Sequence, residues 1–276
     1  MTAPGSGAPD VRELHSMADL DATAHLFAEI WGTPQSGAPI SAEIMRALSH
    51  AGNYVAGAYE NGRLVGASVA FFGEPSGTTL HSHITGITGT TAGRGIGLAL
   101  KLHQRRWALT RGLKRITWTY DPLIRRNAHF NLTKLGARPE EYLRSFYGAM
   151  DDAINGGDES DRVLAAWDLA APLPAPDTVG IPLPAGAVHV LREVDGRPQP
   201  SYAEGEFVVI ELPGDIESLR RTDPAAARAW RHALRHTLGD LLADGARVLG
   251  LHDRRGYVVH RTPTSTPDRL STGSNP

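Results

Sequence analysis

The sequence contains no cysteine among its 276 residues. This absence excludes disulfide bonds, thiolate metal sites and a cysteine nucleophile. No apolar run approaches the roughly 20 residues that a membrane-spanning helix needs, and residues 1–10 lack the charged and apolar regions of a secretory signal. The formal net charge is −2, which gives no reason to expect nucleic acid or an anionic membrane as a partner. We therefore expect a cytoplasmic globular protein.

The spacing of apolar and turn-forming residues predicts an α+β protein. Helical periodicity and strand-like alternation recur in the first half of the chain, and Asn61-Gly62 is a strong hairpin signal. The elements expected there are a strand at 11–14, helices at 20–31 and 41–50, strands at 54–59, 64–72 and 80–88, a helix from 96, a strand at 115–120, a helix at 127–135 and a strand within 142–150.

The character of the chain changes after residue 150. We expect a flexible leader (1–9), a first domain (10–155), a proline-rich connection (156–186), a smaller α+β domain (187–261) and a disordered polar tail (262–276). The second domain should hold strands at 188–193, 207–212, 248–252 and 257–260, with a helix at 224–244 between the second and third of these. A strand-like segment at 163–169 lies inside the connection.

A glycine-rich turn between the strand at 80–88 and the following helix is the most informative stretch. It contains Gly89, Gly93, Gly95 and Gly97. Glycines let backbone N–H groups approach a phosphate closely, and the start of a helix carries partial positive charge. The turn therefore indicates a pyrophosphate cradle, with a plain strand–helix connection as the alternative.

Two motifs at the right separation resemble the GNAT superfamily of acyl-CoA-dependent N-acyltransferases. Ala92–Gly97 (AGRGIG) resembles the family's Gln/Arg-x-x-Gly-x-Gly/Ala turn, with Ala92 where the family prefers Gln or Arg. Residues 127–137 resemble its downstream segment of an Asn, a short helix and a closing Leu-Gly. The resemblance covers residues 11–150. The run at 118–123 (WTYDPL) and the C-terminal extension also resemble a less-studied branch of that family.

The resemblance implies a GNAT-type mixed, mostly antiparallel sheet flanked by helices, with acetyl-CoA or another acyl-CoA as co-substrate and no metal. Backbone N–H groups of Arg94, Gly95, Ile96 and Gly97 would bind the pyrophosphate. The main chain at Ile87 and Thr88 would pair with the pantetheine arm as an added strand does. Asn127 could reach the cofactor, or could cap its helix.

Candidates for the chemistry flank the turn. His81 lies eleven residues before Ala92, where some family members carry a catalytic Glu, and His83 should share its strand face. A histidine with a pKa near 6.5 is a suitable general base; the alternative is that both fill a half-buried strand face. Asp121 could bind the substrate ammonium or act as base, or could be a turn residue before Pro122.

The family's thiolate-protonating Tyr is replaced by Leu132, and Tyr147 is the nearest substitute for it. The histidines and Asp121 fit no common metal-ligand spacing. The function implied is transfer of an acetyl or other acyl group, succinyl included, from CoA to a primary amine of a small molecule, with an amino acid as one candidate. The alternative is a non-catalytic acyl-CoA-binding or regulatory module. The C-terminal domain could shape the acceptor pocket, support a homodimer or be a degenerate second copy of the same fold.

Overall fold

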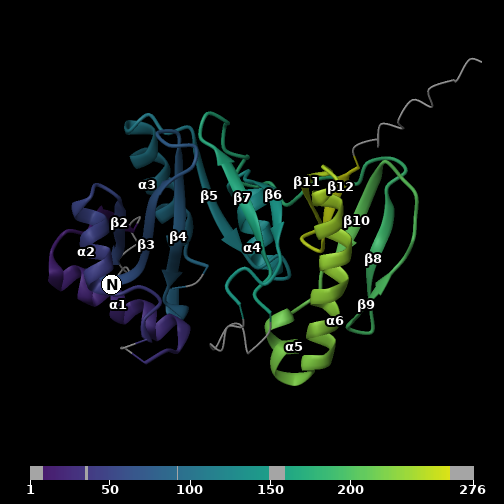
Figure 1. Cartoon of the computed structure of the whole chain (residues 1–276), viewed down its shortest axis with the longest axis horizontal. Helices are drawn as coiled ribbons and strands as arrows, with labels where there is room; N and C mark the ends of the chain where they lie inside the picture. The colour runs from purple at the N-terminus through teal and green to yellow at the C-terminus, as the bar shows by residue number, and fades with distance from the viewer. Residues whose placement is uncertain (1–8, 35–36, 92, 149–158, 262–276) are drawn as a thin grey trace, which may run out of the picture.

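The computed structural model describes residues 9–34, 37–91, 93–148 and 159–261. These residues form two sheets with helices, lying side by side (Figure 1). The strands of the first sheet follow the order β1-β2-β3-β4-β5-β7-β6. Their bounds are β1 (Asp10–Glu13), β2 (Tyr54–Glu60), β3 (Arg63–Gly73), β4 (Thr79–Ile87), β5 (Arg115–Tyr120), β6 (Arg138–Leu143) and β7 (Arg162–Asp168). β4 and β5 run parallel and the other neighbours antiparallel, which confirms the predicted α+β class.

Helices cover both faces of the first sheet. On one face lie α1 (Met17–Trp31) and α2 (Ala42–His50), packed against Val55 of β2. On the other lies α3 (Ile96–Thr110), whose Trp107 and Ala108 share a cluster with Ala56. Val55 and Ala56 are consecutive strand residues, so their side chains point to opposite faces.

The first helix begins earlier than predicted, at Met17 instead of residue 20. Its N-cap is Ser16, whose Oγ accepts from the N–H of Asp19. Asp19 sits three residues into the helix, where its carboxylate accepts from the Ser16 hydroxyl. A Ser with an acidic residue three positions later is a favourable helix start.

The first sheet extends past the predicted domain boundary at residue 155. β7 lies beyond that boundary, yet it pairs with both β5 and β6. The strand predicted within 142–150 was wrong, because β6 ends at Leu143 and turns follow it. Between β5 and β6 the helix α4 (Arg125–His129) continues into the π-helical turn η3 (Phe130–Lys134). The predicted leader (1–9, except Pro9) and tail (262–276) lie outside the described residues.

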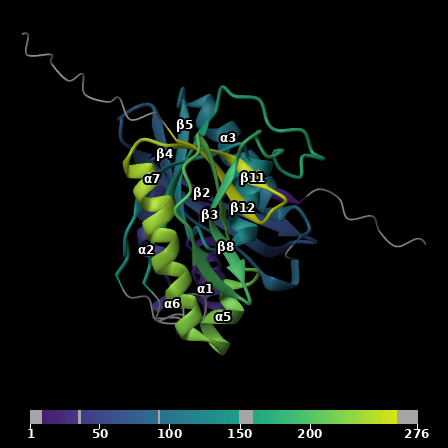
Figure 2. The same cartoon turned by 90° about the vertical axis from the view of Figure 1, so that its right-hand side faces the viewer.

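The second sheet has the strand order β11-β12-β10-β8-β9. Figure 2 shows its helices running along one side of the molecule. The elements of this block are β8 (Val188–Val194), β9 (Arg197–Pro200), β10 (Phe207–Glu211), α5 (Ile216–Thr222), α6 (Pro224–Leu234), the π-helical turn η4 (Arg235–Gly239), α7 (Asp240–Ala243), β11 (Arg247–His252) and β12 (Gly256–His260). The predicted helix at 224–244 is thus present with a π-helical turn inside it, while β9 and α5 were not predicted.

The second block repeats the topology of the last part of the first sheet. In the first block β5 pairs antiparallel with β7, and β7 with β6; in the second β10 pairs antiparallel with β12, and β12 with β11. In each, a helix that contains a π-helical turn leads to Gly-Ala-Arg, whose glycine has positive φ: 73° at Gly136 and 82° at Gly245. This correspondence favours the interpretation of the second block as a degenerate partial copy.

The two blocks share one hydrophobic core. Trp167 of β7 and Leu135 after η3 belong to the same buried cluster as Ile210 of β10 and Trp230 of α6. Arg138 of β6 donates from Nη1 to the backbone oxygen of Leu249 in β11 at 3.1 Å. The second block is therefore packed into the first. Among the described residues no helix has the length and apolar character needed to cross a membrane.

Candidate active site

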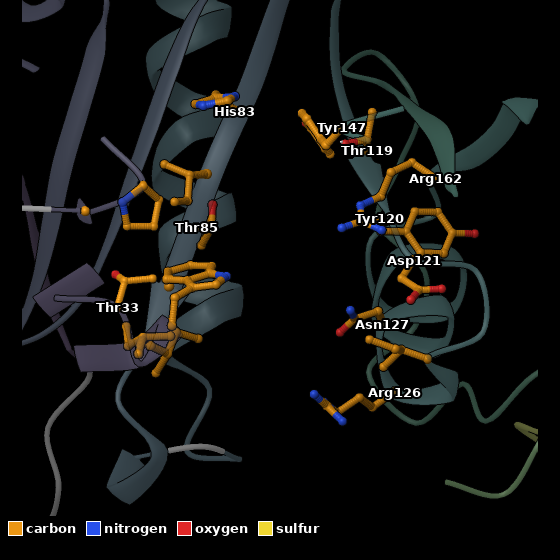
Figure 3. A pocket seen from close by; sticks show the side chains of 18 residues that line it. Thr33, His83, Thr85, Thr119, Tyr120, Asp121, Arg126, Asn127, Tyr147 and Arg162 are labelled. Atoms are coloured by element: carbon orange, nitrogen blue, oxygen red, sulfur yellow. Dashed lines mark hydrogen bonds between the residues drawn. The ribbon is translucent and has the colours of Figure 1, made fainter. Parts of the chain in front are cut away.

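A cavity opens where two parallel strands separate. β4 and β5 pair only through Thr79–His81 and Arg115–Thr117, and within the described residues they make no bridge beyond these positions. The cavity has a volume of about 610 Å³. Figure 3 shows it as a gap with a β4 wall and a β5–α4–β7 wall. The lining residues used below are His83, Thr85, Thr119, Asp121, Asn127, Tyr147 and Arg162, with Trp31 from α1.

A buried lysine sits where the strands part. Lys101 of α3 is 5% exposed, and its Nζ donates to Ser82 Oγ at 2.9 Å and lies 3.9 Å from the centre of the Trp118 ring. Ser82 and Trp118 are the first residues of β4 and β5 beyond the last paired residues. Burial lowers the pKa of Lys101 to about 7. Lys101 therefore bridges the two strands at the apex of the gap.

The start of α3 has the features expected of an anion site. Its N-cap is Gly95, with φ 83°, and no described side chain caps it. The first N–H groups of a helix have no partner within the helix, so those of Ile96 and Gly97 remain as donors aided by the helix dipole. A Cβ on Gly97 would lie 2.9 Å from Ile87 Cδ1, so glycine lets this turn pack against β4. These residues fit the pyrophosphate of an acyl-CoA.

Two main-chain N–H groups of the predicted cofactor site have partners within the protein. The N–H of Arg94 donates to Thr91 O at 3.2 Å, and the N–H of Thr88 donates to Val65 O at 2.9 Å. The Arg94 side chain pairs with Glu60 at 3.1 Å. Of the N–H groups expected to bind the pyrophosphate, those of Ile96 and Gly97 lie in the first turn of α3. Ala92 lies outside the described residues.

His81 and His83 lie beside each other against the Phe71 ring, whose centre is 5.2 Å from that of His81 and 5.7 Å from that of His83. The pairing of β3 with β4 skips His83, since Ala70 faces Ser82 and Val69 faces Ile84. Strand alternation puts His83 on the same side as His81 and away from Lys101, and the bulge brings the next residue, Ile84, to that side as well. Only His83 of the two lines the cavity; His81 Nδ1 is 3.1 Å from Thr117 Oγ1.

Both histidines are held in the neutral form. Burial lowers the pKa of His83. Burial, His83 and Lys101 together lower the pKa of His81 to about 4. A neutral imidazole at physiological pH can accept a proton, so both have the protonation state that a general base needs.

Asp121 is the turn residue that the sequence offered as one interpretation, since its Oδ1 accepts from the N–H of Leu123 at 3.0 Å and its backbone oxygen accepts from the N–H of Ile124 at 3.2 Å. Its carboxylate is 5% exposed and accepts from Arg231 Nη1 and Nη2, both at 2.9 Å, and from Arg220 Nη2 at 2.5 Å. Burial alone would raise the pKa of Asp121, but the ion pairs and hydrogen bonds with Arg231 and Arg220 outweigh it and lower the pKa. A carboxylate neutralised in this way is a weak base and a poor partner for a substrate ammonium.

The remaining wall carries hydrogen-bond donors. Tyr147 Oη is 3.1 Å from Thr119 Oγ1, and Asn127 lines the cavity from α4. Arg162, at the start of β7, is 8% exposed and projects toward the gap (Figure 3). Neither Arg162 nor Lys101 can be recognised from the sequence, because nothing in the residues next to them marks a site. Among the described residues no group of three or more His, Asp or Glu side chains is arranged to hold a metal ion.

Comparison with known proteins gives likeness of fold only. No protein-family model and no curated protein matches the sequence. An N-acetyltransferase from Staphylococcus aureus matches 59% of this chain and 99% of its own, with 16% identity and a TM-score of 0.49. An acetyltransferase of the GNAT family from Streptococcus pneumoniae matches 61% of this chain and 100% of its own, with 15% identity and a TM-score of 0.47. A Salmonella typhimurium protein solved with its cofactor acetyl-CoA matches 62% of this chain and 99% of its own, with 17% identity and a TM-score of 0.47.

Proposed function

We propose that this protein is an acyl-CoA-dependent N-acyltransferase that acts on a primary amine of a small molecule. The observation that carries the proposal is the arrangement around the strand separation. An uncapped, glycine-rich helix start lies on the α3 side of the sheet, and a neutral histidine lines the gap from the other side. A thioester reaching through the gap would meet an amine held beside His83.

The α3 side would hold the cofactor. The N–H groups of Ile96 and Gly97 would bind the pyrophosphate, and the edge of β4 beyond His81 is left without a strand partner on the β5 side, so it can pair with the pantetheine arm. Asn127 lines the same gap. Bound acyl-CoA supplies the activated acyl group, whose C–S bond breaks as the C–N bond forms, with one proton leaving nitrogen and one reaching sulfur.

His83 would take the proton that leaves the amine, because it lines the cavity in the neutral form. His81, held at Thr117 and packed on Phe71, would fix the position of its neighbour. Tyr147 lines the opposite wall and has a hydroxyl partner in Thr119, so it is the candidate to return a proton to sulfur. Asp121 has no role as base in this scheme, because Arg220 and Arg231 neutralise it.

The test is an assay of free thiol with acetyl-CoA and succinyl-CoA over a panel of amines. We expect thiol release that depends on an acceptor and an N-acylated product by mass spectrometry. His83→Ala should lower kcat/KM by about 100-fold, the usual contribution of a positioned base. The matched control is His50→Ala, which replaces an exposed histidine at the end of α2. CoA binding without turnover for any acceptor would instead favour the acyl-CoA-binding module.

A further inference from the structure

The acceptor side of the cavity is built from residues that share one sheet face. Thr119 of β5 pairs with Leu164 of β7, and Arg162 is two residues from Leu164, so Arg162 and Thr119 point to the same face. His81 contacts Thr117, the next residue on that face of β5. Lys101 and α3 lie on the opposite side. Arg162 therefore belongs to the acceptor half of the gap, away from the proposed pyrophosphate site.

Arg162 is held in place by its surroundings. It is 8% exposed, its Nη1 donates to Asp161 O at 3.0 Å, and its guanidinium lies 5.5 Å from the centre of the Tyr147 ring. Burial lowers its pKa, and arginine still keeps its charge at every physiological pH. A fixed, largely dehydrated guanidinium on a cavity wall is well suited to a bidentate oxyanion.

The two carboxylates near Arg162 are already paired with other residues, so this wall has little negative charge to attract a cation. The carboxylate of Asp121 lines the same wall but is ion-paired with two arginines of the second block. The carboxylate of Asp161 accepts from Arg235, the Tyr142 hydroxyl and the N–H of Ser145. Asn127 and Tyr147 add polar groups able to donate hydrogen bonds. The described wall thus carries hydrogen-bond donors and the positive charge of Arg162, which also keeps contacts within the protein.

We propose that Arg162 forms an oxyanion subsite, so that the acceptor is an amine that also carries a carboxylate or a phosphate. The oxyanion binds at Arg162, beside Thr119 and Tyr147, and the amine faces the β4 wall with His83 (Figure 3). This inference rests on the proposed function. It differs from the prediction for Asp121, since the group recognised on this wall is the anion of the acceptor and not its ammonium.

The experiment compares matched acceptors with acetyl-CoA. β-Alanine is paired with β-alaninamide, and phosphoethanolamine with ethanolamine, so that each pair differs in the anion. We expect the wild-type protein to favour the charged member of at least one pair by 10-fold or more in kcat/KM. Whichever pair shows the larger ratio distinguishes a carboxylate from a phosphate. Similar rates for both members of both pairs would overturn the subsite and leave the acyltransferase proposal standing.

The variant Arg162→Met keeps the aliphatic bulk of the side chain and removes its charge. We expect it to raise KM for the charged acceptor about 10-fold with little change in kcat, and to leave KM for the neutral acceptor within 2-fold. Arg162→Lys should restore part of the preference, because it restores charge without the bidentate geometry. Arg144→Ala is the control, since Arg144 forms an exposed pair with Asp240. An unchanged preference in Arg162→Met would refute the assignment.

A binding measurement separates this proposal from the proposed function. Calorimetric titration of phosphoethanolamine and β-alanine into the wild-type protein and Arg162→Met needs no turnover. Binding that is lost in the variant, together with no thiol release for any acceptor, would support the subsite and refute the acyltransferase. Thiol release with neutral amines alone, without binding of phosphoethanolamine or β-alanine, would support the acyltransferase and refute the subsite.

Discussion

At the scale of single residues, the protonation of the histidines gives the clearest expectation. Burial lowers the pKa of His83, and that of His81 is lowered to about 4. Because the neutral form is the base, activity should persist below pH 6.5, the ordinary pKa of histidine. We expect the acid limb of a kcat/KM profile, corrected for ionisation of the acceptor amine, to lie below that value. A limb at or above pH 6.5 would contradict the assignment of His83.

Lys101 should influence stability through its burial. Its folded pKa of about 7 lies below the value of 10.5 for an unperturbed lysine. The folded protein therefore binds fewer protons between pH 7 and 10.5, so this group makes the unfolding free energy rise with pH, by at most about 1.4 kcal/mol per pH unit. The contribution of Lys101 to the unfolding free energy is therefore complete above pH 10.5 and is lost as the pH falls through 7.

Lys101→Met removes this dependence. We expect the unfolding free energy of the variant to exceed that of the wild type most at pH 6–7, with the difference shrinking toward pH 9.5, because the cost of the buried charge is largest where the lysine is protonated. Urea denaturation at four pH values measures it. The exposed Lys114→Met is the control, and a difference that grows with pH would refute the interpretation.

The predictions made from the sequence failed most at residues whose partners are far along the chain. The turn expected at Asp121 before Pro122 is present, because its Oδ1 accepts from the N–H of Leu123, but its ion-pair partners Arg220 and Arg231 are 99 and 110 positions away. Lys101 gave no signal, because one lysine in a helix is ordinarily exposed. His81, His83 and the glycine turn could be found because they depend on local spacing.

At the scale of elements, the start of α3 is held in shape by glycine. Gly95 has φ 83°, and a Cβ there would meet no atom within 4 Å, so substitution adds backbone strain and no clash. We expect Gly95→Ala to cost about 1–2 kcal/mol of stability and to weaken CoA binding, because the N–H groups of Ile96 and Gly97 would turn. Denaturation and calorimetric titration of CoA measure the two effects.

The control for this variant is Gly214→Ala. Gly214 lies in a loop of the second block, and its nearest neighbour to a new Cβ is a side-chain oxygen of Glu193 at 4.0 Å. Gly214→Ala should therefore leave both the unfolding free energy and the affinity for CoA near the wild-type values. Unchanged CoA affinity in Gly95→Ala would place the pyrophosphate elsewhere.

Element order was predicted better than element boundaries. The hairpin of β2 and β3, the helix α3 and strand β5 all follow from periodicity and turn residues. The position of β7 did not, because the segment 163–169 looked like part of a linker and its pairing with β5 and β6 is set only by the fold. Which strands pair outside a hairpin depends on contacts between distant segments of the chain, and the local sequence pattern does not determine these contacts.

At the scale of the whole molecule, the second block supports the wall of the proposed active site. Arg220 of α5 and Arg231 of α6 reach from that block to Asp121 at the end of β5. Arg125 and Arg126 of α4 pair with Glu193 and Glu217 of the same block. The block thus fixes the β5–α4 wall, which fits the predicted role of shaping the acceptor pocket.

The strongest test of this coupling is Arg231→Met. Arg231 is 1% exposed, and its loss leaves the buried Asp121 with Arg220. Breaking a buried ion pair by removing one partner costs about 3–5 kcal/mol, so we expect a loss of this size in urea denaturation. Arg144→Ala, at an exposed pair, should cost less than about 1 kcal/mol.

A double-mutant cycle and the pH dependence separate the charge from the packing. If the ion pair carries the coupling, Asp121→Asn should cost less in Arg231→Met than in the wild type. The pKa of Asp121 is lowered in the folded protein, so its stabilisation is present above its unfolded pKa of about 3.9 and is lost as pH falls toward the folded value. In Arg231→Met this pKa should rise toward the unfolded one, so the loss of stability on acidification from pH 5 to 3 should be smaller than in the wild type. Additive costs and unchanged acid sensitivity would show that the two blocks are held by their shared apolar core alone.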